Sequence, residues 1–352
     1  MAWLLKDIEF KSCFPHQAES VSFRLFSLRQ TIGCAIISRA VIQRSDSTVP
    51  SMEMIFTQIL TIFGYVVVGF AAGKLGIINP EQRKYLTRIC SDLVQPFTIL
   101  SAASLTIGAA EMQNLGFAIL VMFMTFGLTS LASLWVTRKR VHSERAAFTS
   151  LVTYPNGTYL GLPLNTALFG AIAILYNAAI IVAFNVLFFT LQYSLFTGKK
   201  FSWKNFLTSA NVSTVMMILM LLAGVHFPGP VETVVKNIGA MITPLSLMII
   251  GVMVSENDIL AVLKEKRAYL MVALRNLLIP LCAMAVLRLL PMDQTARMCV
   301  LVYIACPCAA LSIIYAIRFN KEPELCAKTV LLSTLAFSVT LPIIISLGQM
   351  IL

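Results

Sequence analysis

The sequence is poor in charge. Only 12% of its 352 residues are Asp, Glu, Lys or Arg, whereas 58% are hydrophobic. A soluble protein of this length needs roughly twice that share of charged residues to cover its surface. The apolar residues form long blocks between short charged loops, and only helices or closed barrels can span lipid. The blocks do not alternate every second residue, as a transmembrane strand would. The composition therefore predicts an all-α integral membrane protein.

Motifs of several other functional classes are missing. No Gly-x-x-x-x-Gly-Lys-[Ser/Thr] loop occurs, so ATP-driven transport is not expected. The three histidines lie in the N-terminal tail and in two loops, and no His–Cys–Asp constellation falls at membrane depth. The net charge of +11 does not indicate nucleic acid, because Lys and Arg are spread through short loops. We therefore expect no enzyme, cofactor or bound metal.

Ten stretches approach the roughly 20 apolar residues that a membrane-spanning helix needs. The predicted spans are residues 55–73, 85–107, 115–136, 146–168, 171–196, 206–225, 232–254, 268–289, 297–317 and 325–347. Residues 1–51 contain only short apolar runs, and the first span begins just after Met52 and Met54. We expect this N-terminal extension to lie outside the folded core, or to be an artefact of start-codon choice.

Lys and Arg are concentrated in one set of loops, which holds 17 of them against 3 in the opposite set. Basic loops tend to stay in the cytoplasm. We therefore expect both ends of the ten-span core to face out of the cytoplasmic (inner) membrane of a bacterium. The basic linker 197–205 would then lie in the cytoplasm between two five-span halves, residues 52–196 and 206–352.

The two halves are interrupted at matching places. The second and seventh spans carry "QPFTILSAAS" (95–104) and "TPLSLMIIGV" (243–252), and the fourth and ninth carry "YPNGTYLGLP" (154–163) and "ACPCAALSII" (305–314). An odd number of spans per half forces the halves into opposite orientations. Inverted repeats with helices broken at corresponding places point to a secondary transporter with a site at the midplane. Each proline frees a backbone carbonyl, which must face protein or a water-filled cavity.

The fourth span, "YPNGTYLGLPLNTALFG", resembles the signature of the auxin efflux carrier family in a shifted form, with Asn156, Thr158, Gly161, Pro163 and Gly170 in place. The first, ninth and tenth spans are also similar to the family's opening and ending, so the resemblance covers residues 54–352. The sequence departs from the family pattern at Gln95-Pro96-Phe97, Asn156-Gly157-Thr158 and Cys306-Pro307-Cys308.

The resemblance implies the inverted five-plus-five fold of sodium/proton antiporters and bile-acid symporters, with spans four and nine crossing at their prolines. It also implies a carrier of small organic anions such as auxin, malonate or malate. Spans 1, 2, 6 and 7 would form a scaffold, and spans 3–5 and 8–10 a transport unit that gives alternating access. Export is expected from the family. Coupling to protons or sodium, plain uniport and a homodimer all stay open.

Asn156 is the residue that we expect to touch the cargo, because an amide offers a donor and an acceptor without a buried charge. Capping of the broken helix is the alternative. The other expected substrate-binding residues are Gly157, Thr158, Gln95, Cys306 and Cys308. The helix crossing is assigned to Pro155, Gly161, Pro163 and Pro307.

Two ionisable residues inside predicted spans are candidates for ion or proton coupling. Asp92 could exchange a proton or pair with a cation; alternatively, it lies near the cytoplasmic end, where Arg88 screens it. Arg275 could attract an anion or pair with an acid; alternatively, it snorkels to the interface.

Alternatives to an anion carrier remain. Cys306-Pro307-Cys308 is an element of heavy-metal pumping ATPases, where thiolates suit soft metals, but the phosphorylation site and nucleotide domain of such pumps are missing. An ion-coupled symporter or antiporter for another small solute, and a non-transporting sensor or channel on the same fold, stay open.

Overall fold

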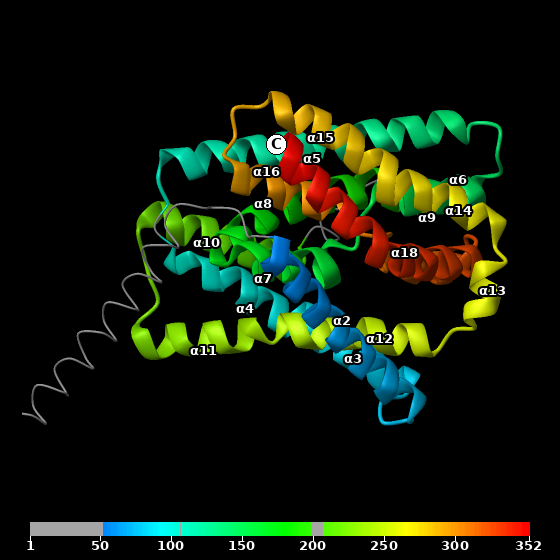
Figure 1. The fold of residues 1–352 in the computed structure, drawn as a ribbon, viewed down its shortest axis with the longest axis horizontal. Coiled ribbons are helices and arrows are strands. Elements are labelled where there is room, and N and C mark those ends of the chain that lie inside the picture. The colour runs from blue at the N-terminus through cyan, green and yellow to red at the C-terminus, as the bar shows by residue number, and fades with distance from the viewer. Residues whose placement is uncertain (1–51, 106, 199–206) are drawn as a thin grey trace, which may run out of the picture. The chain divides into compact units, whose positions relative to one another are not determined.

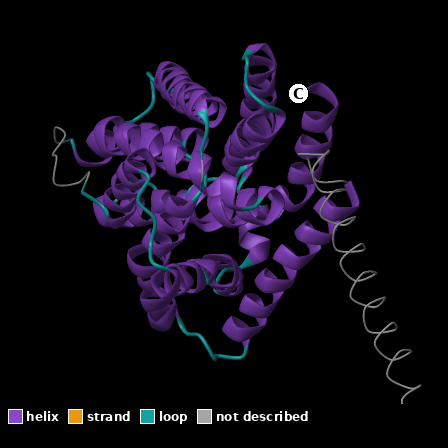
Figure 2. Ribbon diagram, turned by 90° about the vertical axis from the view of Figure 1, so that its left-hand side faces the viewer, coloured by secondary structure: helices purple, strands orange, loops and turns teal. Residues whose placement is uncertain are grey.

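The computed structural model describes residues 52–105, 107–198 and 207–352, in which the regular structure is helical (Figure 2). The N-terminal extension 1–51 and most of the linker 197–205 lie outside the described residues. Five helical segments among the described residues are long and apolar enough to cross a membrane: Ala109–Val136, Ala171–Thr197, Gly229–Ser255, Lys266–Leu289 and Pro323–Ile351. Shorter apolar helices accompany them. The all-helical class is as predicted, whereas ten spans in two inverted halves stay a prediction.

The first half of the described chain forms helices at the places of the predicted spans (Figure 1). Several are interrupted by short π-helical turns, which are labelled η here. In chain order they are α2 (Met52–Lys74), α3 (Pro80–Ile89), η1 (Cys90–Val94), α4 (Gln95–Ser101), the 3₁₀ turn η2 (Ala102–Ser104), α5 (Ala109–Val136), α6 (His142–Thr153), η3 (Gly157–Gly161), α7 (Leu162–Phe169), α8 (Ala171–Leu187), η4 (Phe188–Gln192) and α9 (Tyr193–Thr197).

The second half follows the same style of construction, with one short extra helix between the seventh and eighth predicted spans. Its elements are α10 (Ser209–Ala223), α11 (Gly229–Ala240), α12 (Ile242–Ser255), α13 (Ile259–Leu263), α14 (Lys266–Ala273), η6 (Leu274–Leu278), α15 (Ile279–Leu289), α16 (Gln294–Ala305), α17 (Leu311–Phe319) and α18 (Pro323–Ile351).

Several helices begin at capping residues. The Asn79 side chain accepts from the Gln82 N–H at 2.9 Å, and the Gln82 side chain accepts from the Asn79 N–H at 2.8 Å. This capping box starts α3, with Pro80 in its first turn. Asp293 starts α16 by accepting from the Ala296 N–H at 2.7 Å. These caps satisfy donors that the first turn of a helix leaves without partners.

The most extensive helix pairing joins α2 to α12, which cross in Figure 1. Their backbones touch, because a Cβ added to Gly69 would lie only 2.1 Å from the carbonyl oxygen of Met248. α4 packs beside them, against both α10 and α11. There the Thr98 hydroxyl donates to the carbonyl of Gly239 at 2.8 Å. Small residues allow this close approach in lipid, where packing and hydrogen bonds replace the hydrophobic effect.

The fourth and ninth predicted spans are broken in their middles and contact each other there. α6 ends at Thr153 and α16 ends at Ala305, and each chain is extended before the next helical turn begins. Between the two extended stretches, the Asn156 N–H donates to the carbonyl of Pro307 at 2.7 Å, and the Ala309 N–H donates to the carbonyl of Tyr154 at 2.9 Å. This antiparallel bridge satisfies backbone groups that the broken helices leave free.

Candidate functional site

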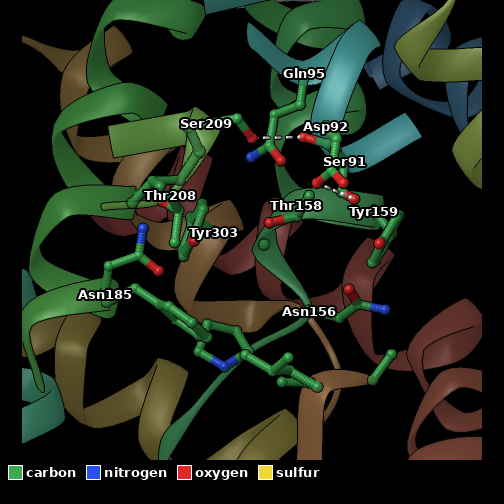
Figure 3. Close-up of a pocket in the computed structure, with 18 residues that line it drawn as sticks. Ser91, Asp92, Gln95, Asn156, Thr158, Tyr159, Asn185, Thr208, Ser209 and Tyr303 are labelled. Atoms are coloured by element: carbon green, nitrogen blue, oxygen red, sulfur yellow. Dashed lines mark hydrogen bonds between the residues drawn. The ribbon is translucent and has the colours of Figure 1, made fainter. Parts of the chain in front are cut away.

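A cavity of about 210 Å³ lies beside this antiparallel bridge. Figure 3 shows Gln95, Ser91 and Asp92 on one side of it and Asn156 and Asn185 across the view, with Thr158 between. Its walls come from η1 and α4, the η3 region, α8, and the starts of α10 and α17. The polar side chains that line it are Ser91, Asp92, Gln95, Asn156, Thr158, Tyr159, Asn185, Thr208, Ser209 and Tyr303.

Three helix N-termini meet at this cavity. Gly157 and Thr158 begin η3, Ser209 begins α10 after its cap Thr208, and Leu311 begins α17, and all of them line the cavity. The first turn of each helix carries N–H groups without helical partners and the positive end of the helix dipole. Among the described residues no Lys, Arg or His side chain lines the cavity, and the charged side chain in its lining is that of Asp92.

Two buried amides in the lining hold free hydrogen-bonding capacity. Gln95 is 4% exposed and Asn156 is 6% exposed. Among the described residues neither side chain has a hydrogen-bond partner, although the Asn156 backbone is held in the bridge. Buried polar groups are nearly always hydrogen-bonded, so amides like these are suited to meet a ligand or water. Asn156 does not cap the broken helix, since its side chain forms no cap hydrogen bond.

The Tyr303 side chain, from α16, packs directly against the backbone of Gly157. A Cβ added to Gly157 would lie 2.0 Å from the Tyr303 hydroxyl oxygen, closer than real Cβ contacts allow. One turn later, a Cβ on Gly161 would meet the same ring at 3.0 Å and the sulfur of Cys306 at 3.3 Å. Glycine is therefore needed at position 157 for Tyr303 to complete the cavity wall.

The prolines take different places. Pro155 lies in the bridge, opposite Cys308, and also lines the cavity. Pro307 offers its carbonyl to the Asn156 N–H in the same bridge. Pro163 lies in the first turn of α7, buried and outside the cavity lining. Its position past the break fits the tolerance of helix starts for proline.

Arg275 is fully buried and does not line the cavity. From η6, its guanidinium donates to the Cys306 carbonyl at 3.1 Å, to the Thr153 carbonyl at 3.1 Å, to the Val152 carbonyl at 3.4 Å and to the Ile304 carbonyl. These acceptors lie at the ends of α6 and α16, so one side chain closes both broken helices. The snorkelling alternative is wrong for this residue, because it has no exposed surface. Its coupling role stays a prediction.

Cys306 and Cys308 are buried beside the bridge and do not line the cavity. The Cys306 thiol donates to the Val302 carbonyl at 3.4 Å. The Cys308 N–H donates to the Ser333 hydroxyl at 2.8 Å, and that hydroxyl donates to Asn276 at 2.9 Å. Within the described chain, no group of three or more His, Cys, Asp or Glu residues could hold a metal ion. The structure thus surrounds both cysteines with protein, and their contact with cargo stays a prediction.

Asp92 lies at the mouth of the cavity, with its side chain 60% exposed and 3.5 Å from Arg88. The Ser91 hydroxyl donates to the Asp92 carboxylate at 3.0 Å, and the Ser209 hydroxyl donates to the Ser91 carbonyl at 3.2 Å. This geometry is that of the screened alternative. Asp92 nevertheless faces any solute that enters, so its coupling role stays a prediction.

Several lining residues were missed by reasoning from the sequence: Tyr159, Asn185, Thr208, Ser209 and Tyr303. Thr208 and Ser209 had a usable signal, since a Thr-Ser pair before an apolar run is typical of a helix start. Asn185 is hydrogen-bonded to Asn211 at 2.6 Å, a contact between spans that sequence spacing does not reveal.

Comparison with known families gives a match for this chain. A family described as "Membrane transport protein" matches residues 54–214 and 198–345, which together cover most of the chain. A search of curated proteins gives no significant match. Together with the apolar helices, the family match makes this chain a multi-pass membrane protein. The chain therefore belongs to the membrane transport protein family, whose members are the auxin efflux carrier-like transporters.

Proposed function

We propose that the protein is a secondary transporter that moves a small organic anion, such as a carboxylate, across the cytoplasmic membrane by alternating access. One observation carries this proposal. The cavity beside the crossed segments is lined by three helix N-termini and two unpartnered amides, with no basic side chain among the described residues. Family membership supports transport, and the cavity suggests the charge of the cargo.

The charge argument rests on which helix ends meet the cavity. An α-helix carries about half a positive charge at its N-terminus and half a negative charge at its C-terminus. The N-termini of η3, α10 and α17 line the cavity, whereas Arg275 binds the C-terminal carbonyls of α6 and α16 away from it. These helix ends favour an anion, as broken helices in other transporters do. The Asp92 carboxylate in the lining lies at the mouth, 3.5 Å from Arg88, which offsets its charge.

The position of the cavity mouth supports cytoplasmic access. Asp92 is exposed there, and it follows α3, which carries the exposed basic residues Lys84 and Arg88. Basic loops are expected in the cytoplasm. This arrangement supports an inward-open conformation, from which a cytoplasmic anion would enter for export.

The helix contacts support the inverted repeat. If the first predicted span corresponds to the sixth, and so on, each contact should recur with the halves exchanged. The pairs α2–α12 and α10–α4 correspond in this way, as do α5–α8 with α15–α18 and α7–α8 with α17–α18. Such pairing is what two similar five-helix halves in opposite orientations would produce.

Ion pairs at the basic loops support the division into a scaffold and a transport unit. Arg83, just before the second predicted span, pairs with Glu256 after the seventh at 2.8 Å. Arg267, just before the eighth predicted span, pairs with Glu144 just before the fourth at 3.8 Å and with Glu322 before the tenth at 3.7 Å. Each set joins spans of one proposed unit and would leave the units free to move against each other.

Uptake into proteoliposomes across a panel of mono- and dicarboxylates tests this proposal. We expect at least one carboxylate to show saturable uptake, and imposed proton or sodium gradients would reveal coupling. Asn156→Ala should abolish transport without lowering thermal stability by more than about 1 kcal/mol, because its side chain has no protein partner. Asn257→Ala, an exposed residue outside the cavity, is the matched control.

Three outcomes would count against the proposal. If no carboxylate moves and none shifts thermal stability, the protein is not a carrier of this class. Non-saturating flux would favour a channel on the same fold. Full activity of Asn156→Ala would remove that residue from the site.

A further inference from the structure

A second hollow, separate from the cavity at the crossing, runs between α5 and the α14–η6–α15 helix. It has a volume of about 540 Å³ and reaches α6 at its base. Its walls are apolar and include Leu128 and Val136 of α5, Phe148 of α6, and Leu270 and Leu278 of the opposite helix. Leu128, Val136, Leu270 and Leu278 are exposed. On helices that cross a membrane, exposed leucines face lipid tails, so this groove is open to the bilayer.

One end of the groove carries aromatic residues of the kind that mark a membrane–water interface. Trp135, beside the groove residue Val136, is 66% exposed, and Tyr269, beside Leu270, is 48% exposed. Trp and Tyr gather where lipid tails meet headgroups. The Arg138 guanidinium lies 5.3 Å from the Trp135 ring centroid. This end of the groove therefore lies at headgroup depth.

Unpaired lysines stand at the same end. Lys139 follows α5 three residues after Val136, and Lys266 precedes Leu270 by one helical turn, on the same face of α14. Both are exposed, and among the described residues neither has an acidic partner. The carboxylates of Glu144 and Glu265, which lie nearby in the sequence, form ion pairs with Arg267 instead.

We propose that this groove is a binding site for an anionic phospholipid. One acyl chain lies between α5 and α15, and the phosphate meets Lys139 and Lys266 at the interface. The apolar walls alone would accept the chain of any lipid, so the lysines provide the preference for negative charge. Basic pockets between helices on the cytoplasmic side commonly hold anionic headgroups. This site does not depend on what the crossing cavity transports.

Cys282 provides a local reporter, because it lines the groove and is exposed, whereas the other described cysteines are buried. The full chain carrying Cys13→Ser and Cys34→Ser would be labelled with bimane maleimide in detergent. It would then be titrated with phosphatidylglycerol or phosphatidylcholine bearing brominated acyl chains, which quench bimane on contact. We expect phosphatidylglycerol to quench at a lower concentration.

Lys139→Ala combined with Lys266→Ala should raise the half-quenching concentration of phosphatidylglycerol by roughly thirtyfold, since each lysine near a headgroup contributes about 1 kcal/mol. The pair Lys74→Ala and Lys84→Ala removes the same charge outside the groove and should leave the titration unchanged. Ala132→Phe, at an exposed groove position, should weaken quenching by both lipids.

The proposal fails if phosphatidylcholine quenches as well as phosphatidylglycerol, or if the two lysine pairs behave alike. It also fails if Cys282 is shielded from both lipids because a second copy of the chain covers the groove, which dimer cross-linking through Cys282 would reveal. None of these readings uses transport, so loss of the proposed transport function would not mimic them.

Discussion

Arg275 is fully buried where the broken helices α6 and α16 meet. A buried guanidinium without a carboxylate is unusual, since isolated charges are costly to bury. Here its donors meet four carbonyls at the ends of two broken helices. Those ends carry partial negative charge, so the residue acts as a counter-charge to both. Its neighbour Asn276 holds the other side of the crossing through Ser333.

Arg275→Met should therefore lower stability by about 3 kcal/mol or more, because each buried carbonyl left without a donor costs roughly 1–3 kcal/mol. Thermal unfolding in detergent measures this loss. The loosened crossing should also expose Cys306 and Cys308 to maleimide below the unfolding temperature. Arg318→Met, an exposed arginine of α17, should change stability by less than about 0.5 kcal/mol. Equal stability of the two variants would show that Arg275 does not hold the crossing.

The sequence alone identified some of the residues that line the cavity and missed others. Pro155, Asn156 and Gln95 were identified because a proline break or an amide inside an apolar span is visible locally. Tyr303 was not, because its role depends on the close approach of Gly157 from a segment far away in the chain. The cysteines were placed in the substrate site by their position beside Pro307, yet their side chains turn into packed protein.

At the scale of helices, the pairing of α2 with α12 is the most extensive contact between two elements in the part of the chain that the structure describes. A side chain on Gly69 would clash with the Met248 backbone. A Cβ added to Gly64, five residues earlier in the same helix, would have no neighbour within 4 Å. The difference between two glycines of one helix gives a direct test of helix packing.

Gly69→Ala should destabilise the protein by about 1–3 kcal/mol, because the added methyl forces the two backbones apart. Gly64→Ala should be neutral or stabilising by up to about 1 kcal/mol, as expected for alanine in an open helix position. Thermal unfolding of both variants in the same detergent makes the comparison. If both variants melt alike, the close α2–α12 contact is not present in the folded protein.

The helix interruptions also differ in whether the local sequence predicts them. Proline and glycine predicted the breaks in the fourth and ninth spans. The π-helical turn η6 has no such marker within "LRNLL", although Pro280 follows it closely. This turn carries Arg275 and Asn276, both of which hold the crossing.

For the whole molecule, the distribution of basic residues predicts which side of the membrane each loop faces. The loop of Lys139 belongs to the basic set, and the loop of His226, between α10 and α11, belongs to the opposite one. Both residues are exposed, which makes them suitable for labelling from solution.

A cysteine introduced at either position should report the orientation. His226→Cys should react with a membrane-impermeant maleimide in intact cells, and Lys139→Cys should react only after permeabilisation. Labelling is read by mass shift, with the unsubstituted chain as background. The reverse pattern would invert the proposed topology and, with it, the side to which the crossing cavity opens.

Sequence alone was sufficient for the all-helical membrane class and for the family, because apolar length, basic loops and proline motifs are local properties of the chain. The geometry of the site was not accessible in that way. Arg275 meets Thr153 across 122 positions of sequence, and Asn156 lines the cavity while its backbone N–H is held in the bridge to Pro307. Such contacts depend on packing between distant helices, which decides whether a polar group in a span faces a cavity, a partner or a broken helix end.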